Sequence, residues 1–399
     1  MTFFSQPPLF NRGIFMRLIV AADKLLYNGE LVDDHVLEIK HGKIVNLLSK
    51  ETVRKPDYTY RGIIAPGLID THIHGYEGVE VIDASVEELV TMKQKLLKCG
   101  VTSFLPTLQT DAPDKISQAI NNITEAQKNS QGAQIVGIFL EGPFLAEAFK
   151  GAQDGRFLQE PSIEQLREWQ AESDGLIKKI AIAPELAGAS EFITYATQQG
   201  IVVAIGHSNA TAAEAENAID NGATVAIHTF NAMRYLHHRE PGIIGESLIN
   251  DDLYAELICD GYHLDKRIVD LILRAKGVDR SLLITDGTKA SGLPDGDYNR
   301  SGVPIQVRGG AVRTKDGALA GSSLSLLQAV KNIVTWDKVS LVEALQMATI
   351  NPAKSLKLEK EFGGFCKGAR ADFVVLDVQL DVIATWVNGV ENLINKENE

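Results

Sequence analysis

Histidines and carboxylates recur where short apolar runs of the sequence end, and this is the strongest chemical signal in the chain. A single histidine after a strand is usually a structural residue. Several imidazoles and carboxylates in equivalent positions indicate a shared site that binds metal ions and moves protons. The residues placed in this way are His72, His74, Glu141, His207, His228, Asp260, His263 and Asp286.

The segment His72-Ile73-His74 predicts two ligands for one metal ion. Side chains repeat with a period of two along a strand, so both imidazoles face the same side. Glu141 follows in FLEGPF and can bridge two ions, because a carboxylate has two oxygens. His207 and His228 would then supply nitrogen ligands to the second ion. The pattern therefore predicts a centre with two divalent ions.

Such a centre would perform hydrolysis, because water held between two cations ionises near neutral pH. Asp286 ends the run LLITDG. A bare carboxylate at the end of an apolar strand is costly to bury without a partner. We therefore expect Asp286 to touch a metal ion through one oxygen and to act as the proton shuttle.

The elements that must position these residues follow one plan after residue 62. A short apolar run, a polar residue at its end and a helical segment occur in sequence eight times, which is typical of buried parallel strands alternating with helices. Ser85 with Glu88, and Ser340 with Glu343, form capping boxes that predict helix starts. The plan predicts an α/β fold, a (β/α)₈ TIM-type barrel whose active site lies at the carboxyl ends of the strands. The eight runs are 63–74, 101–107, 135–142, 178–185, 201–208, 223–230, 254–261 and 281–287.

The two ends of the chain differ from the barrel. Residues 17–62 and 369–392 contain short strand runs broken at Gly, Asn and Asp, which predict one small β-sandwich built from both ends. The expected division is an N-terminal extension at 1–15, the β-sandwich domain at 16–62 and 364–399, and the metal-dependent barrel catalytic domain at 63–363. We expect the extension to be dispensable, because a strand-like run starts at Met16.

Composition limits the class of partner. Lys and Arg number 39 and Asp and Glu 52, a net charge of −13, which argues against nucleic acid or an anionic membrane. The three cysteines are far apart and form no CxxC motif, so a reducing cytoplasm is expected. No apolar run reaches the roughly 18 residues of a membrane span, and no signal peptide pattern is present. An anionic small substrate would need a local group of donors.

The segment PGLIDTHIHG at 66–75 resembles the first barrel strand of the amidohydrolase superfamily of metal-dependent hydrolases. Further motifs make the chain, over about residues 17–390, similar to the N-acetylglucosamine-6-phosphate deacetylase family within it. That resemblance implies metal-dependent removal of acetate from an amino-sugar phosphate in amino-sugar catabolism. The motifs are LEGPF (140–144), KGA (150–152), GHSNA (206–210), HTFNAM (228–233), REPG (239–242), DGYHL (260–264), TDG (285–287), LAGS (319–322), NPAK (351–354) and ADFVVLD (371–377).

The resemblance also implies roles for the candidate ligands. Glu141, His207 and His228 would hold the metal found throughout the family. His72 and His74 would complete a second metal site, which some members lack because they have Gln and Asn at these positions. Asp286 would be the catalytic acid and base as well as a ligand. The resemblance therefore implies two metal ions per subunit. Zinc, iron, manganese, cobalt and nickel all suit such ligands.

For the substrate, the resemblance implies that Asn231 and Ala232 bind the phosphate through their backbone, together with Arg239. Arg239 would reach across the interface of a homodimer, and its planar guanidinium suits phosphate oxygens. Gln153 stands where the family commonly has a histidine, and it can donate a hydrogen bond but cannot carry a proton. The residues that would line the sugar site are Ala152, His263, Leu319, Ala320 and Gly321.

Three alternatives remain open. The motifs allow N-acetylgalactosamine 6-phosphate as the substrate, because they determine the acetyl and phosphate groups more firmly than the sugar epimer. A dihydropyrimidinase or dihydroorotase is expected to use a carboxylated lysine, and the strand of Glu141 contains none. A non-catalytic relative that serves as an interaction protein would have lost metal ligands, yet all six candidate positions are filled here.

Overall fold

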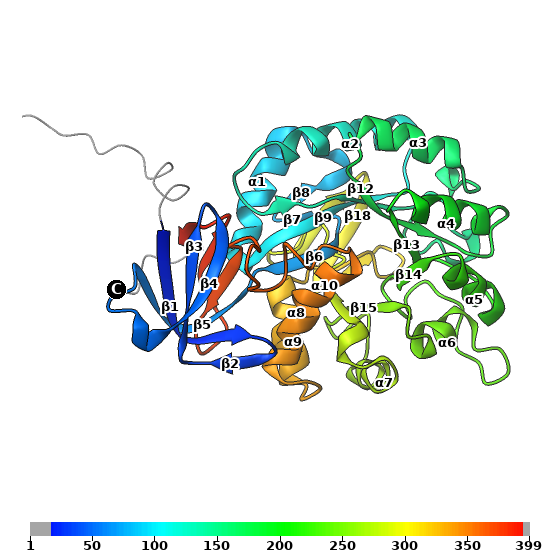
Figure 1. The fold of residues 1–399 in the computed structure, drawn as a ribbon. Coiled ribbons are helices and arrows are strands. Elements are labelled where there is room, and N and C mark those ends of the chain that lie inside the picture. The colour runs from blue at the N-terminus through cyan, green and yellow to red at the C-terminus, as the bar shows by residue number, and fades with distance from the viewer. Residues whose placement is uncertain (1–16, 394–399) are drawn as a thin grey trace, which may run out of the picture.

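The computed structural model describes residues 17–393, so the expected extension at 1–15 lies outside the described residues. Figure 1 shows two β-structured parts side by side, a barrel surrounded by helices and a smaller sheet that contains both the first and the last strands of the chain. No helix in the described part is long and apolar enough to cross a membrane.

The barrel confirms the predicted fold class, because each of the eight runs contains a strand and neighbouring strands pair in parallel. A parallel bridge between Ile73 and Gly287 joins the first strand to the segment after the last. The backbone N–H of Asp286 also donates to the carbonyl of His72 at 2.9 Å. In spatial order the strands are β6 (Leu68–Ile73), β9 (Val101–Gln109), β11 (Ile138–Glu141), β12 (Ile177–Ile182), β13 (Val202–Ile205), β14 (Ala223–Ala226), β15 (Tyr254–Ile258) and β16 (Ser281–Ile284).

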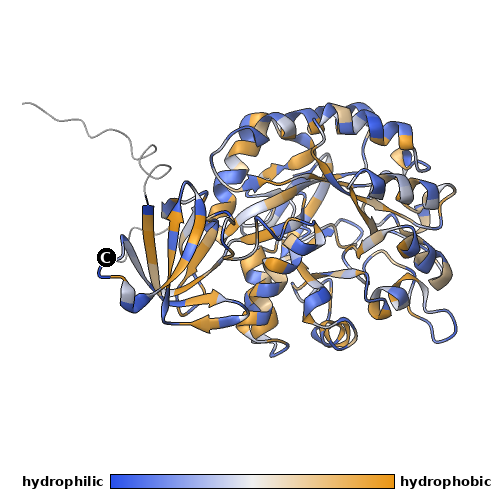
Figure 2. Cartoon of the chain, viewed as in Figure 1, coloured by the Kyte–Doolittle hydropathy of each residue, from blue (hydrophilic) through white to orange (hydrophobic). Residues whose placement is uncertain are grey.

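Helices follow the strands and cover the outside of the barrel. Both predicted capping boxes are present, with Ser85 at the start of α1 and Ser340 at the start of α9. The helices turn their apolar faces inward, so the orange strands of Figure 2 lie inside a shell of helices whose outer faces are blue. The helices are α1 (Val86–Leu96), α2 (Pro113–Gln127), α3 (Ile163–Glu172), α4 (Ala189–Gln198), α5 (Ala212–Asp220), α6 (Gly242–Ile249), α7 (Lys266–Lys276), α8 (Leu326–Thr335), α9 (Leu341–Ala348) and α10 (Ile350–Ser355).

The smaller sheet confirms that both chain ends fold together. It curls around one apolar core, in which the rings of Phe373 and Trp386 stack with centroids 5.1 Å apart. One edge strand also contacts the segment that precedes Phe373, because the N–H of Ile44 donates to the carbonyl of Ala369 at 2.8 Å. The first of the eight runs divides here, because residues 63–66 end β5 rather than begin β6. The order is β22 (Val390–Leu393), β21 (Val382–Val387), β20 (Phe373–Leu376), β5 (Tyr58–Pro66), β1 (Arg17–Tyr27), β3 (His35–Lys40) and β4 (Lys43–Ser49), and β2 (Glu30–Val32) pairs with β1.

A three-stranded antiparallel sheet between β16 and α8 was not anticipated from the sequence. It consists of β17 (Gly296–Arg300), β18 (Val303–Arg308) and β19 (Ala311–Thr314), and it places Arg300 and Leu319 at the mouth of the barrel. The remaining short elements are β7 (Gly75–Tyr76), β8 (Val79–Glu80), β10 (Gln134–Ile135), η2 (Lys50–Thr52), η3 (Val81–Asp83), η4 (Leu97–Cys99), η5 (Glu147–Phe149), η6 (Gly155–Phe157) and η7 (Val278–Arg280).

Candidate metal centre and substrate pocket

The predicted ligands lie at the carboxyl ends of the barrel strands. Glu141 is the last residue of β11, while His207, His228 and Asp286 each lie two residues beyond a strand. These three residues have positive φ values of 47°, 29° and 47°. Non-glycine residues pay a conformational cost for such backbone angles, and residues of this kind concentrate at functional sites.

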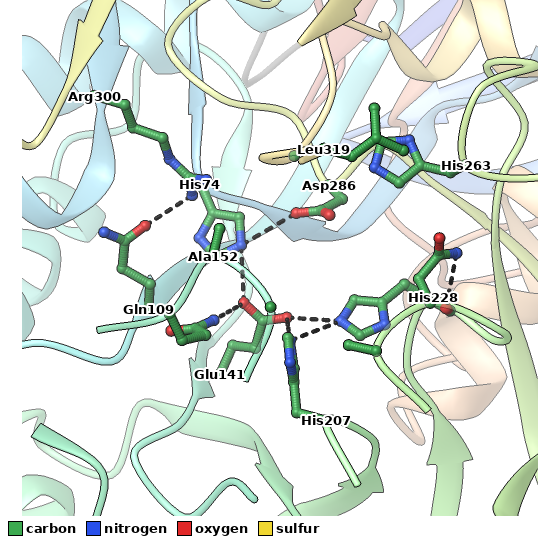
Figure 3. A pocket seen from close by; sticks show the side chains of 15 residues that line it. His74, Gln109, Glu141, Ala152, His207, His228, His263, Asp286, Arg300 and Leu319 are labelled. Atoms are coloured by element: carbon green, nitrogen blue, oxygen red, sulfur yellow. Dashed lines mark hydrogen bonds and ion pairs between the residues drawn. The ribbon is translucent and has the colours of Figure 1, made fainter. Parts of the chain in front are cut away.

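Glu141 lies at the centre of a cluster of four imidazoles, and Figure 3 draws those of His74, His207 and His228. Its Oε1 is 3.2 Å from His207 Nε2, 3.0 Å from His228 Nε2 and 3.3 Å from His72 Nε2. Its Oε2 is 3.1 Å from His74 Nε2. The cluster contains two sets of three ligand atoms, each set lying within 4.8 Å, and Glu141 belongs to both. A carboxylate shared in this way can contact two ions at once.

Asp286 lies beside the first of these sets. Its Oδ1 is 3.3 Å from His74 Nε2 and 3.7 Å from His72 Nε2. Burial alone would raise the pKa of this carboxyl, but the hydrogen bond from His74 and the charge of His72 hold the pKa well below its usual value. The surroundings of Asp286 therefore favour the ionised form of its carboxyl group.

Hydrogen bonds behind the imidazoles show that a cation fits this cluster. The Nδ1 of His207 lies 2.9 Å from the carbonyl oxygen of Phe149, which only accepts, so the hydrogen is on Nδ1. The lone pair on Nε2 then faces the carboxylate of Glu141. The Nδ1 of His72 lies 3.0 Å from Glu256 in the same way, and its buried Nε2 has no hydrogen-bond partner within residues 17–393. Lone pairs facing a carboxylate repel unless a cation lies between them, so these residues fit a divalent metal.

The pKa of the His72 imidazole reflects its negatively charged surroundings. Burial lowers the pKa of this imidazole, but the neighbouring carboxylates of Glu141 and Glu256 outweigh burial and raise the pKa to about 10. The two carboxylates therefore stabilise a positive charge at this place, either a proton on His72 or a metal ion bound to it.

A cavity of about 170 Å³ opens over the cluster, and its walls contain most of the predicted substrate residues. Of those predicted residues, Arg239 does not line the cavity of its own chain. Its side chain is exposed, and Nη1 lies 2.8 Å from Nε2 of His238. Ala320 and the ligand His72 are buried behind the wall. The predicted substrate residues that do line the cavity are Ala152, Gln153, Asn231, Ala232, His263, Leu319 and Gly321.

Gln153 and His263 are each held in position by hydrogen bonds. The side-chain amide of Gln153 donates to Glu141 Oε2 at 2.8 Å and accepts from the backbone N–H of Thr110 at 2.7 Å. The Nδ1 of His263 lies 2.6 Å from Asp260 Oδ2. Burial lowers the pKa of His263, but Asp260 outweighs it, so the pKa is raised overall.

Sequence reasoning missed Gln109, Gly151 and Arg300, which also line the cavity. Arg300 is buried, and it donates from Nε to Glu80 and from Nη2 to Gln109, both at 2.7 Å. It lies on β17, outside the repeating strand and helix pattern, so no signal in that pattern could have revealed it.

Sequence reasoning also missed two buried charges below the cluster, Lys179 on β12 and Glu256 on β15. A charged residue inside an apolar strand run is a usable signal, because burying it requires a partner.

The chain is similar to known proteins over most of its length. The model of the Amidohydrolase family matches residues 63–392. The N-acetylglucosamine-6-phosphate deacetylase of Vibrio furnissii is 36% identical over 372 residues, covering 92% of this chain and 93% of the relative. The N-acetylgalactosamine-6-phosphate deacetylase of Escherichia coli O157:H7 is 37% identical, covering 94% and 99%. The structure of a mutant N-acetyl-D-glucosamine-6-phosphate deacetylase from Mycobacterium smegmatis, in complex with N-acetyl-D-glucosamine-6-phosphate, has a TM-score of 0.89 at 30% identity, covering 95% and 100%.

Proposed function

Because the chain belongs to the amidohydrolase family, we propose that it is a deacetylase that hydrolyses N-acetyl-D-glucosamine 6-phosphate to D-glucosamine 6-phosphate and acetate. The observation that carries this proposal is Glu141, surrounded by four imidazoles and facing a cavity that also contains Asp286. A relative named for this activity matches 92% of this chain, which supports the proposal.

We propose two divalent ions per subunit. Glu141, His207 and His228 would hold one, and His72, His74 and Glu141 the other, with Asp286 beside it. When bound, such ions lower the pKa of water and polarise the acetyl carbonyl. Zinc, iron, manganese, cobalt and nickel all suit these ligands. The ion that is bound would therefore depend on which metal is available to the protein.

In the reaction, Asp286 takes the proton from the attacking water, because its ionised carboxylate faces the cavity. It then gives that proton to the amide nitrogen. The bond between this nitrogen and the acetyl carbon breaks, and the amino sugar is released. His263, oriented by Asp260, lies on the same wall of the cavity and would position the sugar. Gln153 would hold Glu141 in place rather than carry a proton.

We propose that the phosphate is bound by the backbone of Asn231 and Ala232 and by Arg239 of the partner subunit in a homodimer. Arg239 is exposed on the loop before α6 rather than in the cavity of its own chain. Tyr235 and Leu236 on that loop are 82% and 47% exposed, and they form an apolar surface that a second copy could cover.

We also propose that the enzyme works in the cytoplasm, because its three unpaired cysteines fit a reducing compartment.

Acetate release from the two epimeric sugar phosphates tests the function. With metal-replete protein, we expect a higher kcat/KM on N-acetylglucosamine 6-phosphate than on N-acetylgalactosamine 6-phosphate. The second sugar is a specific alternative, because one relative that matches 94% of this chain is named for it. A higher kcat/KM on the galacto epimer would identify N-acetylgalactosamine 6-phosphate as the preferred substrate. Failure to release acetate from either sugar would reject the proposal.

A further inference from the structure

Below the candidate metal centre, Lys179 and Glu256 form an ion pair inside the barrel. Lys179 and Glu256 are 1% and 0% exposed, and the ammonium contacts Oε1 of the carboxylate. Their strands, β12 and β15, are not neighbours, because β13 and β14 lie between them. The two side chains therefore meet across the barrel interior. The ammonium also lies 4.0 Å from the ring centroid of Phe139 and 3.4 Å from the carbonyl oxygen of Thr71.

The second oxygen of Glu256 faces both halves of the metal centre. Oε2 lies 3.0 Å from Nδ1 of His72 and accepts from the backbone N–H of His228 at 3.3 Å. An ionised carboxylate has no hydrogen to donate, so the hydrogen lies on Nδ1 of His72. The lone pair of Nε2 is then left for a metal ion. The contact to His228 involves only backbone and leaves the side-chain tautomer of His228 free.

We propose that the Lys179–Glu256 pair is a positioning element that fixes the metal-binding tautomer of His72, and so sets the affinity of the His72/His74 half of the centre. This inference rests on the proposed metal centre. Lys179 determines which oxygen of Glu256 is available, because it occupies Oε1 and leaves Oε2 for His72. Carboxylates that accept a hydrogen bond from a ligating histidine raise its basicity, and their loss typically costs about 10- to 100-fold in metal affinity.

Glu256→Gln reverses the tautomer in this scheme. The amide has a single oxygen, and the ammonium of Lys179 attracts it. The NH₂ group then faces Nδ1 of His72, which must accept, so the hydrogen moves to Nε2. A protonated Nε2 cannot bind a metal. Adding Lys179→Met removes the competitor, so the amide oxygen can turn to His72 and restore the original tautomer.

The experiment is a competition titration of Zn²⁺ against a chelator, which measures the affinity of each bound ion. We expect Glu256→Gln to weaken one ion about 10- to 100-fold, with the other hardly changed. The Lys179→Met/Glu256→Gln variant should recover most of this loss. A merely structural role predicts the opposite, because a second buried substitution should add damage. Unchanged affinity in Glu256→Gln, equal weakening of all ions, or further loss in the double variant would each overturn the proposal.

A matched pair covers the case in which Glu256→Gln alone fails to fold. The variants Lys179→Met/Glu256→Gln and Lys179→Met/Glu256→Leu both replace the ion pair with neutral side chains of similar size, a change that proteins commonly tolerate. They differ in whether residue 256 can accept from His72. The Leu variant should bind one ion about 10- to 100-fold more weakly than the Gln variant, and equal affinities would contradict the proposal. Zn²⁺ alone is the probe, so the result is independent of the acetate-release assay that tests the function.

Discussion

At the scale of single residues, Glu141 and Asp286 have different proposed roles, metal binding for Glu141 and proton transfer for Asp286. Glu141 lies between two pairs of imidazoles, so we propose that it contacts both metal ions. Asp286 contacts the imidazoles through Oδ1 at 3.3 Å or more, and it lines the cavity. Its Oδ2 makes no hydrogen bond or ion pair to another described residue, so that oxygen is available to a reacting proton.

Asp286→Asn should lower kcat by several orders of magnitude while metal content and substrate binding persist. The amide has nearly the same shape as the carboxylate but cannot take a proton. Single-turnover rates, measured beside metal analysis and equilibrium binding of the sugar phosphate, separate these effects. Near-normal turnover would remove Asp286 from its proposed role.

The double substitution His72→Gln/His74→Asn should leave one ion per chain, held by Glu141, His207 and His228. Neither replacement offers an imidazole nitrogen, so the first set of ligands is lost while the second is intact. Metal analysis after metal-replete purification gives the stoichiometry, with the unsubstituted chain as control. One ion in the unsubstituted chain, or two in the double variant, would contradict a centre with two ions.

At the scale of elements, the ends of parallel strands place ligands that are distant in sequence. β13 and β14 end two residues before His207 and His228, and the chain turns sharply at both histidines. Gly206 permits the two strand ends to pack closely, because a Cβ there would lie 2.2 Å from Cγ1 of the buried Ile227. The two strand ends can approach so closely only without a side chain at residue 206.

Gly206→Ala should therefore weaken metal binding by the His207/His228 half and destabilise the fold by about 1–3 kcal/mol. The added methyl group must displace Ile227, which precedes His228 directly. Zn²⁺ titration and thermal unfolding measure the two effects. Gly364→Ala is the control, because the nearest atom to its added methyl would be 3.9 Å away and the backbone needs no positive φ. Equal behaviour of the two variants would show that close packing at residue 206 is unimportant.

At the scale of the whole molecule, the acidic chain must bind an anionic substrate. The net charge is −13, and the buried Arg300 is already paired with Glu80. Arg239 is an exposed cation that does not line the cavity of its own chain, so we propose that a site shared within a homodimer brings it to the phosphate.

Complementation tests this shared site. Subunits with Asp286→Asn are mixed with subunits with Arg239→Ala, each nearly inactive alone on the phosphorylated substrate. In a mixed dimer one site carries both defects, and the other combines an intact Asp286 with Arg239 of the partner subunit. Random pairing should therefore restore roughly a quarter of the unsubstituted activity. Activity at the parental level, in a preparation shown to contain mixed dimers, would place Arg239 in its own subunit's site.

The sequence by itself determined the barrel, the joining of the two chain ends and the clustering of the candidate metal ligands. Each depends on local signals: apolar strand runs at regular intervals, capping boxes such as Ser85 with Glu88, and a His-x-His pair whose spacing places both rings on one face. The positions of His207 and His228 were also readable, because residues at the carboxyl ends of parallel strands converge in a barrel.

Only the tertiary structure decided what surrounds those ligands. Lys179 and Glu256 meet across the barrel interior from non-adjacent strands, and Arg300 reaches the cavity from a sheet outside the repeating pattern. Gln153 contacts Glu141 through a loop whose path no periodicity describes. Periodicity reports which face of an element is buried, whereas the partner of a buried polar group depends on the closure of the barrel and the course of its loops. These partners set the tautomers and charges on which the chemistry depends.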